Sequence, residues 1–585
     1  MRSSWFSRQS RLGSHAPGGL LGRSTGVALA LTIGLTGLPA AEAKPAAPAQ
    51  PKLIVLVSVD QMRSDYVDQF GKAWKKGLRR LYREGAVFTE ARFPYLNTIT
   101  CAGHSTIGTG AYPHRHGMVL NGWWSREQNK VVECTDDPNS PVIAYGDPSQ
   151  SKIGHSALNL QVPTLAEAMK SSLTPKPRVV SFSGKARSAI GLVGKAGDIV
   201  TWLELGGWVT SRFFTEAPHP LVTAVSARNP VDKLVAKPWT KIGPASAYKY
   251  ADDDAAETPP MPFWTPRFPH ELQVPPGAKS ASSQTPLVPL AAWERSPGPD
   301  AVLLEFAKAA LSDMKIGQGE STDVLALSFS ALDSIGHPFG PRSHEIQDVL
   351  LRLDGLLGEL LTTLDRKVGR GRYVLALTAD HGVANHPEHL TKEGVDAGRV
   401  SMGGLARAVN EVIRAEIGPG RHVANPIYTE LYLAPGVMDR LRAKPGAVDK
   451  VKAAILSRPG ILAVFSADEL KDPAAASSPL QRAAALSHFP SRSGDFTFVP
   501  KPNWITVSTG TTHGTANDYD QRVPVILFGS RVKRGSYTRE SSPADIATTL
   551  AALLGVSLPT AEGRVLNEAL SPPLSTIAGL GNPRP

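Results

Sequence analysis

Short, continuous runs of apolar residues recur along the chain and alternate with stretches that have a helical period. Such runs are typical of strands that are covered on both faces by helices. The first of them follows a linker rich in proline and alanine at residues 44–51. The predicted strands are residues 53–59, 86–88, 178–183, 324–329, 373–378 and 522–528.

Between these runs, apolar residues return every three to four positions, which predicts amphipathic helices. The longest segment, 344–368, carries isoleucine, valine and leucine on a single face. Thr164 and Glu167 have the spacing of a capping box. Ser542, Pro543 and Asp545 are expected to cap a later helix in the same way. The predicted helices are one through Trp74, Leu78 and Leu81 that ends at Gly85, one opening at Thr164, and those at 301–313, 344–368 and 543–554, the last with Pro543 as its first helical residue.

Strands and helices alternate along the chain, and this order predicts an α/β fold. We expect a three-layer sandwich with a mostly parallel central sheet. Two stretches interrupt the alternation: prolines crowd residues 211–299, and residues 400–500 have a mixed pattern. The first still contains scattered tryptophans, which disordered segments lack, so both are expected to be inserted caps. Residues 44–585 would then form one large domain with two insertions.

The N-terminus has the three parts of a secretory signal peptide. Four arginines precede or flank an apolar segment at 27–38, and Ala41-Glu42-Ala43 offers a cleavage site. Removing residues 1–43 lowers the formal charge from +11 to +8. We therefore expect a periplasmic or secreted protein.

No later segment approaches twenty uninterrupted apolar residues, so we expect no membrane span. The basic residues are dispersed rather than clustered, which argues against a nucleic-acid partner. A monomer is the default expectation, although no pattern specifies the oligomeric state.

The chain contains two cysteines, Cys101 and Cys134. An oxidising compartment would permit a disulfide between them, and the chain-entropy model gives such a bond roughly 3 to 4 kcal/mol of stabilisation. Two buried thiols are an equally acceptable alternative, and the sequence leaves both open.

Aspartate and histidine stand at or near the ends of several predicted strands. Each alone is a weak signal, because a single Asp usually caps a turn and a single His usually lies at the surface. Together they are stronger, since strand ends meet at one edge of an open α/β sheet. Asp-x-x-x-His spacing also lets two side chains reach one ion, and zinc accepts oxygen and nitrogen ligands together. The candidate ligands are Asp60, Asp333, His337, Asp380, His381 and His513.

Two other histidines follow the predicted strand at 373–378, but they lie in polar sequence. His386 and His389 belong to the run His-Pro-Glu-His. We expect both to be loop residues without a role in metal binding.

A run of hydroxyl-bearing and small residues at 97–110 predicts the first turn of a helix that carries a nucleophile. Thr100 is the preferred reactive group and Thr98 is its rival. A threonine hydroxyl is a poor nucleophile at neutral pH, so it needs a base or a metal to activate it. The dipoles of a helix N-terminus would help.

These residues together resemble the alkaline phosphatase superfamily, and most closely its threonine-nucleophile phosphate monoesterases. That group is related to the type I phosphodiesterase/nucleotide pyrophosphatase branch. The Thr100-x-x-x-His104 spacing matches its nucleophile, and Asn121 matches its phosphoryl-binding asparagine. Lys185 and Arg187, which directly follow the strand at 178–183, match the Lys-x-Arg pair that marks the monoesterases.

The resemblance implies two zinc ions per subunit. Asp333, His337 and His513 would hold one of them. Asp60, Asp380, His381 and the oxygen of Thr100 would hold the other, and the count stays at two because Lys185 and Arg187 stand where relatives use a third ion. The implied reaction is hydrolysis of phosphate monoesters through a phosphothreonine intermediate, with Asn121, Lys185 and Arg187 meeting the phosphoryl oxygens.

Three alternatives remain at this point. A phosphodiesterase or nucleotide pyrophosphatase of the same superfamily would share the metal ligands, but a dianionic monoester gains more from two cationic side chains. An exported protein that binds zinc or phosphate without chemistry would gain nothing from the hydroxyl. A sulfatase would need a cysteine or serine in a modification motif that the sequence lacks.

Overall fold

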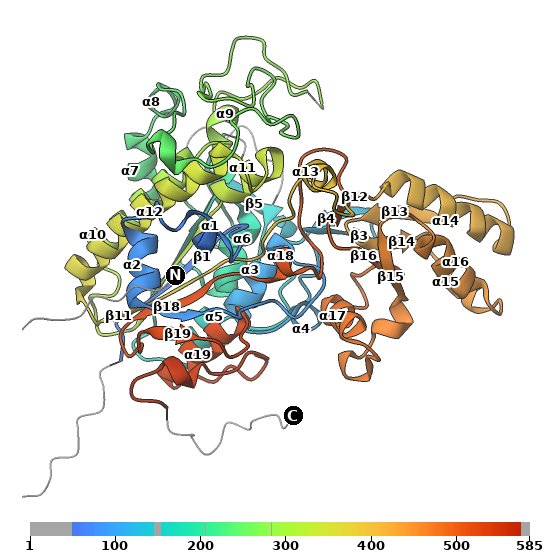
Figure 1. Ribbon diagram of the computed structural model, residues 1–585. Coiled ribbons are helices and arrows are strands. Elements are labelled where there is room, and N and C mark those ends of the chain that lie inside the picture. The colour runs from blue at the N-terminus through green and yellow to red at the C-terminus, as the bar shows by residue number, and fades with distance from the viewer. Residues whose placement is uncertain (1–49, 146–153, 205, 282, 575–585) are drawn as a thin grey trace, which may run out of the picture. The chain divides into compact units, whose positions relative to one another are not determined.

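The central element of the fold is a sheet of 11 strands in the order β19-β2-β18-β11-β1-β10-β7-β8-β9-β5-β6. The structure is a computed structural model that describes residues 50–145, 154–204, 206–281 and 283–574 (Figure 1). The predicted signal peptide at 1–43 lies outside these residues. The strands of the sheet are β1 (Leu53–Val59), β2 (Ala86–Phe88), β5 (Asp136–Ala144), β6 (Gly154–His155), β7 (Val179–Ser183), β8 (Ile199–Glu204), β9 (Gly207–Ser211), β10 (Asp323–Phe329), β11 (Tyr373–Thr378), β18 (Val525–Gly529) and β19 (Gly535–Tyr537).

The five middle strands, from β11 to β8, are parallel, as expected for strands with helices on both faces. Every residue of β1 is buried, so the continuous apolar run is explained by burial on two sides. The sheet becomes antiparallel where β18 joins β11 and where β9 joins β8. The three-layer α/β sandwich is thus confirmed, and its parallel part is the centre of a mixed sheet.

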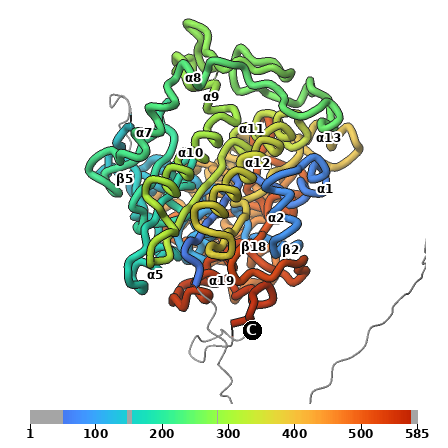
Figure 2. The backbone as a smooth tube through the Cα atoms, turned by 90° about the vertical axis from the view of Figure 1, so that its left-hand side faces the viewer, coloured from blue at the N-terminus to red at the C-terminus, as the bar shows by residue number. Residues whose placement is uncertain are grey.

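Alternate residues of β1 pack into two separate apolar clusters. Val55 and Val57 face the cluster that includes α2 (Gly77–Glu84), α10 (Gly298–Ser312) and α12 (His344–Leu364). Ile54 and Leu56 face the cluster built by helices on the other side of the sheet. Figure 2 looks onto the face covered by α10 and α12. The remaining α-helices outside the two predicted insertions are α1 (Tyr66–Phe70), α3 (Thr100–Thr109), α4 (Pro113–His116), α5 (Leu165–Ser172), α6 (Ala186–Val193), α11 (Ala331–Phe339), α13 (Pro387–Lys392), α18 (Asp518–Gln521) and α19 (Ala544–Leu554).

The proline-rich stretch between β9 and α10 has little regular structure. It contains α7 (Pro220–Arg228), α8 (Val231–Leu234) and α9 (Ala291–Glu294). Its tryptophans, Trp239, Trp264 and Trp293, are buried and join the cluster on the α12 side of the sheet. This packing explains how a segment with so few helices remains ordered.

Residues 401–500 form a separate small sheet with its own apolar cluster, drawn in yellow to orange in Figure 1. The strand order is β13-β14-β16-β15. The elements are α14 (Met402–Ile417), β13 (Val423–Ile427), β14 (Glu430–Leu433), α15 (Val437–Arg442), α16 (Ala447–Leu456), β15 (Ile461–Ser466), α17 (Pro479–Ser487) and β16 (Phe496–Pro500). Two further pairs of short strands are β3 (Gly122–Ser125) with β4 (Lys130–Glu133), and β12 (Gly398–Arg399) with β17 (Trp504–Ile505).

Several predicted boundaries need correction. The helix predicted at 301–313 begins earlier, at Gly298, and the α-helical part of 344–368 ends at Leu364, before a π-helical turn. The capping of the last helix is shifted: Pro543 is the N-cap rather than the first helical residue. Asp545 still accepts a hydrogen bond from the Ser542 N–H at 3.0 Å. The capping box at Thr164 and Glu167 is confirmed.

Within the described residues, no helix combines the length and apolar character needed to cross a bilayer.

Candidate metal centre and nucleophile

The predicted metal ligands come from the carboxyl ends of three neighbouring parallel strands. Asp60 directly follows β1, and Asp380 follows β11. Asp333 lies in the first turn of α11, just after β10. Because β11, β1 and β10 are adjacent and in parallel register, their ends meet at one edge of the sheet. The strand ends therefore bring together carboxylates that are up to 320 positions apart.

Asp333, His337 and His513 form the first ligand group. The Nε2 atoms of His337 and His513 lie 3.2 and 3.7 Å from Asp333 Oδ1. Asp333 and His337 are four residues apart on α11, so one helical turn places them on the same face. His513 comes from the loop that precedes α18. This is the trio that the sequence predicts for one ion.

The second group contains Asp60, Asp380 and His381. His381 Nε2 lies 3.4 Å from Asp60 Oδ1 and 3.3 Å from Asp380 Oδ2. The ligand atoms of Asp60, His381 and Asp333 also lie within 4.8 Å of one another. Asp333 thus stands between the two groups, closer to Asp60 and His381 than its predicted assignment to the first ion alone implied.

Each of the three histidines is held by its other ring nitrogen. The Nδ1 atoms of His337, His381 and His513 lie 2.8, 2.9 and 2.8 Å from the backbone carbonyl oxygens of Thr511, Gly382 and Thr98. A carbonyl accepts only, so Nδ1 carries the proton and Nε2 keeps its lone pair. This is the arrangement in which protein histidines bind metals.

The carboxylates are crowded and buried. Burial, together with Asp333 and Asp380, raises the pKa of Asp60 well above its usual range. Burial also acts to raise the pKa of Asp380, but the neighbouring His381, His104 and Lys185 lower it overall. Burial lowers the pKa of both His381 and His513, so these rings are neutral near pH 7.

A divalent metal fits this donor set. Asp60 Oδ1 and Asp380 Oδ2 are fully buried and have no hydrogen-bond partner among the described residues. Buried polar atoms rarely stay unpartnered without a bound ion or water. Carboxylate oxygens and imidazole nitrogens, with no free thiolate in the described residues, are ligands that zinc accepts.

Thr100 is the first residue of α3 and is buried beside the second group. Its Oγ1 lies 3.3 Å from His381 Nε2. The close approach depends on Gly103, because a Cβ atom there would lie 2.2 Å from the carbonyl oxygen of Asp380. The rival Thr98 donates its hydroxyl hydrogen to the Thr515 carbonyl at 3.0 Å. Of the two threonines, only Thr100 presents its hydroxyl to the ligand groups.

Asn121 lies next to the start of α3. Its Oδ1 accepts a hydrogen bond from the Cys101 N–H at 2.9 Å, which fixes the orientation of the amide. Its Nδ2 therefore points the other way, and donates to the Tyr428 hydroxyl at 3.4 Å.

Lys185 and Arg187 lie at the N-terminus of α6, after β7. Lys185 Nζ lies 2.6 Å from Asp60 and 2.5 Å from Asp333, so its ammonium bridges the carboxylates of both groups. Arg187 Nε is buried and has no hydrogen-bond partner among the described residues. Burial raises the pKa of the nearby Glu133, and the charge of Arg187 only partly opposes this rise.

Two residues near the site were missed by sequence reasoning. Gln61 donates from its backbone N–H to Asp380 at 3.1 Å and from Nε2 to Asp333 at 2.6 Å. It holds a left-handed φ of 69°, a strained conformation that is typical of functional sites. Tyr428 reaches Asn121 from the turn between β13 and β14. The only feature of the sequence that could have pointed to Gln61 is its position directly after Asp60. No feature of the sequence pointed to Tyr428.

The prediction that both His386 and His389 are loop residues is wrong. His389 lies within α13 and pairs with Asp254 at 2.8 Å. His386 is the N-cap of α13 and is fully buried. The polar sequence at 387–392 forms a short helix that hydrophobic periodicity does not predict. Neither histidine belongs to a ligand group within the described residues.

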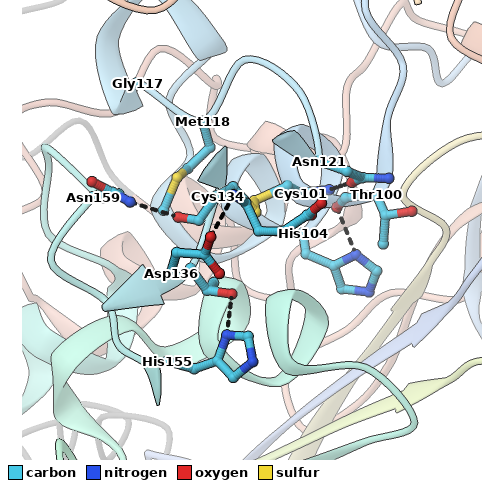
Figure 3. Close-up of a disulfide and its surroundings, with 12 residues drawn as sticks. Thr100, Cys101, His104, Gly117, Met118, Asn121, Cys134, Asp136, His155 and Asn159 are labelled. Carbon is cyan, nitrogen blue, oxygen red and sulfur yellow. Dashed lines mark hydrogen bonds between the residues drawn. A yellow bond between two sulfur atoms is a disulfide. The ribbon is translucent and has the colours of Figure 1, made fainter. Parts of the chain in front are cut away.

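Cys101 and Cys134 form a disulfide, which decides between the two alternatives left open by the sequence (Figure 3). Cys101 directly follows Thr100, and the Cys134 N–H donates to the Asn121 carbonyl at 2.8 Å. The bond therefore ties the first turn of α3 to the segment that carries Asn121.

Replacing both cysteines by serine is expected to lower the free energy of unfolding by about 3 to 4 kcal/mol, because the 33-residue separation no longer constrains the unfolded chain. Urea unfolding of the oxidised wild type and of the Cys101→Ser/Cys134→Ser variant measures the difference. Reductant should shift the wild-type midpoint and leave that of the variant in place. Equal urea midpoints for the oxidised wild type and the variant would contradict a stabilising disulfide.

Comparison with known proteins gives consistent matches. Residues 54–522 match the model of the family described as type I phosphodiesterase/nucleotide pyrophosphatase. Alkaline phosphatase PafA of Elizabethkingia meningoseptica is 28% identical over 92% of this chain and 97% of its own. Alkaline phosphatase PhoK of a Sphingomonas species is 32% identical over 90% of this chain and 92% of its own. A crystal structure of PafA superposes with a TM-score of 0.80 at 27% identity and covers 90% of this chain and 100% of PafA.

Proposed function

Because this chain belongs to the type I phosphodiesterase/nucleotide pyrophosphatase family, we propose that it is a phosphomonoesterase of the alkaline phosphatase kind. The observation that carries the proposal is the position of Thr100 Oγ1, 3.3 Å from His381 Nε2 and beside two groups of metal ligands. The similarity to curated alkaline phosphatases over about nine-tenths of the chain supports the same activity.

We assign two zinc ions to the ligand groups. Asp333, His337 and His513 would hold one, and Asp60, Asp380, His381 and the Thr100 oxygen would hold the other. When bound, zinc would supply Lewis-acid stabilisation of negative charge on the attacking and leaving oxygens. The buried, unpartnered carboxylate oxygens and the anchored histidines support this assignment.

The chain's own residues then account for the chemistry. Thr100 gives up its hydroxyl proton to solvent and its Oγ1 attacks phosphorus to form a new P–O bond. The bond to the ester oxygen breaks, the alcohol leaves with a proton taken from solvent, and a phosphothreonine remains. Water hydrolyses this intermediate and regenerates the threonine. Asn121, Lys185 and Arg187 donate hydrogen bonds to the non-bridging oxygens, because phosphoryl transfer depends mainly on positioning and electrostatics.

A phosphodiesterase or nucleotide pyrophosphatase is the second candidate, since the family model carries that description. Lys185 and Arg187 favour the monoesterase, because a dianionic phosphate gains more from two cations than a monoanionic diester does. A protein that only binds zinc or phosphate would not need the hydroxyl of Thr100 beside the ligands.

We also propose export to the periplasm or the medium, with phosphate monoesters as partners, no nucleic acid, and a monomeric state. The disulfide supports export, since such bonds persist in oxidising compartments. In the same proposal, residues 44–585 are one catalytic domain, and the segments at about 211–299 and 400–500 are insertions that border the site. Tyr428 from the second segment contacts Asn121 in this way.

Removing metal with a chelator is expected to abolish hydrolysis of p-nitrophenyl phosphate and to lower the melting temperature, because the buried carboxylates lose their counter-ions. Zinc should restore both. Elemental analysis of the restored protein should give two zinc ions per chain, and His513→Ala should lower that number. A chelated protein that keeps full activity and an unchanged melting temperature would refute the metal assignment.

A further inference from the structure

A cavity of about 610 Å³ adjoins the ligand groups at His337. Three parts of the chain form it: the middle and end of α11, residues 506–511, and residues of the proline-rich segment, including Thr258 and Arg295. The volume lies within the range of small-molecule sites. The proposed chemistry gives this cavity no role.

A chain of three histidine rings connects Thr100 to the cavity. Thr100 Oγ1 contacts His381, whose ring stacks on that of His513 with centroids 3.4 Å apart. The His513 ring is followed by that of His337 at 5.2 Å, and His337 lines the cavity. The side chain of His337 is 37% exposed, whereas that of His381 is fully buried. In an in-line displacement the leaving group points away from the nucleophile, so a group that departs past His513 and His337 would enter this cavity.

Most residues that line the cavity are polar and none is a carboxylate, although Pro260, Pro338 and Val507 also contribute. Four hydroxyl groups have no hydrogen bond to another described residue and are free to meet a ligand: Ser334, Thr506, Ser508 and Thr509. Arg295 adds the one guanidinium among the lining residues, and it is exposed. Its charge acts on the adjacent Glu294, but it forms no ion pair within 4 Å in the part of the chain that the structure describes.

The floor of the cavity is held in place by hydrogen bonds. The Thr511 N–H donates to the His337 carbonyl at 2.8 Å. Arg399 donates to the carbonyls of Val507 and Gly510 at 3.0 and 2.9 Å. Gly510 has a φ of 62°, and a Cβ there would lie 2.5 Å from the His337 carbonyl. The loop therefore lies against α11 before any ligand arrives, so little ordering cost opposes binding.

We infer that this cavity is a leaving-group subsite that selects phosphate monoesters of hydroxylated, anionic alcohols. The inference rests on the proposed function for the direction of the displacement. Hydroxyl groups of the alcohol pair with the free serine and threonine hydroxyls, and a carboxylate or second phosphate pairs with Arg295. An apolar alcohol leaves these groups without partners, which costs affinity.

Three substrates with the same three-carbon chain test this inference: 3-phosphoglycerate, glycerol 3-phosphate and n-propyl phosphate. For the wild type, kcat/KM should fall in that order, by about fivefold at each step, the scale of exposed charged and polar contacts. Arg295→Gln should remove the preference for 3-phosphoglycerate over glycerol 3-phosphate. Arg534→Gln, an exposed change of equal charge on the loop before β19, should keep the wild-type preference.

Added salt should weaken only the step that depends on Arg295, because exposed charges are screened. Equal kcat/KM for the three substrates, or a preference that Arg295→Gln leaves intact, would overturn the subsite. These outcomes are ratios between substrates of one enzyme. They are therefore separate from the failure of the proposed chemistry, which would appear in the metal requirement and at Thr100.

Discussion

Thr100→Ala is expected to lower kcat for p-nitrophenyl phosphate by a factor on the order of 10⁴ or more, as loss of a covalent nucleophile does in other hydrolases. The reason is positional, since Thr100 Oγ1 points at His381 from the first turn of α3. Alanine fits the same helical position, so folding should be kept. Steady-state kinetics and zinc content, measured on the same preparation, check the expectation.

Thr98→Ala is the matched control for this experiment. Thr98 is two residues away, but its hydroxyl is used by the Thr515 carbonyl. We expect the kcat of the Thr98→Ala variant to stay within about tenfold of the wild-type value, because the substitution removes only one buried hydrogen bond. Thr100→Ser should retain part of the activity because it restores a hydroxyl. Near-normal turnover by Thr100→Ala with full zinc content would rule out the phosphothreonine route.

The double substitution Lys185→Ala/Arg187→Ala is expected to separate monoesters from diesters. For p-nitrophenyl phosphate, kcat/KM should fall by about 10³ to 10⁴, the scale for removing two charged donors from a transition state. For bis(p-nitrophenyl) phosphate the loss should be about tenfold, because its single charge depends less on them. The ratio of the two values is the measurement.

The control for the double substitution is Lys176→Ala/Arg212→Ala, which removes the same charge from two exposed positions. Its ratio should equal that of the wild type. Zinc content must accompany the kinetics, since Lys185 also contacts Asp60 and Asp333. Equal losses on both substrates at full zinc content would favour the phosphodiesterase alternative.

The central fold could be predicted because its strands are buried on both faces. That burial requires a continuous apolar run, and β1, β10 and β11 each have one. The outer strand β5 could not be found in this way. It contains two prolines and several exposed residues, so neither apolar continuity nor alternation marks it.

The site could be predicted as far as strand ends determine it. Asp60 directly follows β1, Asp380 lies two residues past the end of β11, and the parallel pairing of these strands brings them together. Gln61 lies beside them, but its contacts with Asp333 and Asp380 depend on a left-handed backbone that no residue type signals. Tyr428 and the 506–511 loop approach from distant segments, and periodicity says nothing about the path of a loop.

The disulfide has a practical consequence for anyone who produces this protein. It joins the residue after the proposed nucleophile, Thr100, to Cys134, whose N–H binds the carbonyl of Asn121, so the geometry proposed for catalysis is coupled to thiol oxidation. Material expressed in a reducing cytosol would carry two thiols at this junction. Specific activity should then report the oxidation history of a preparation as well as its purity, and refolding without an oxidant should yield a protein that is pure and underactive.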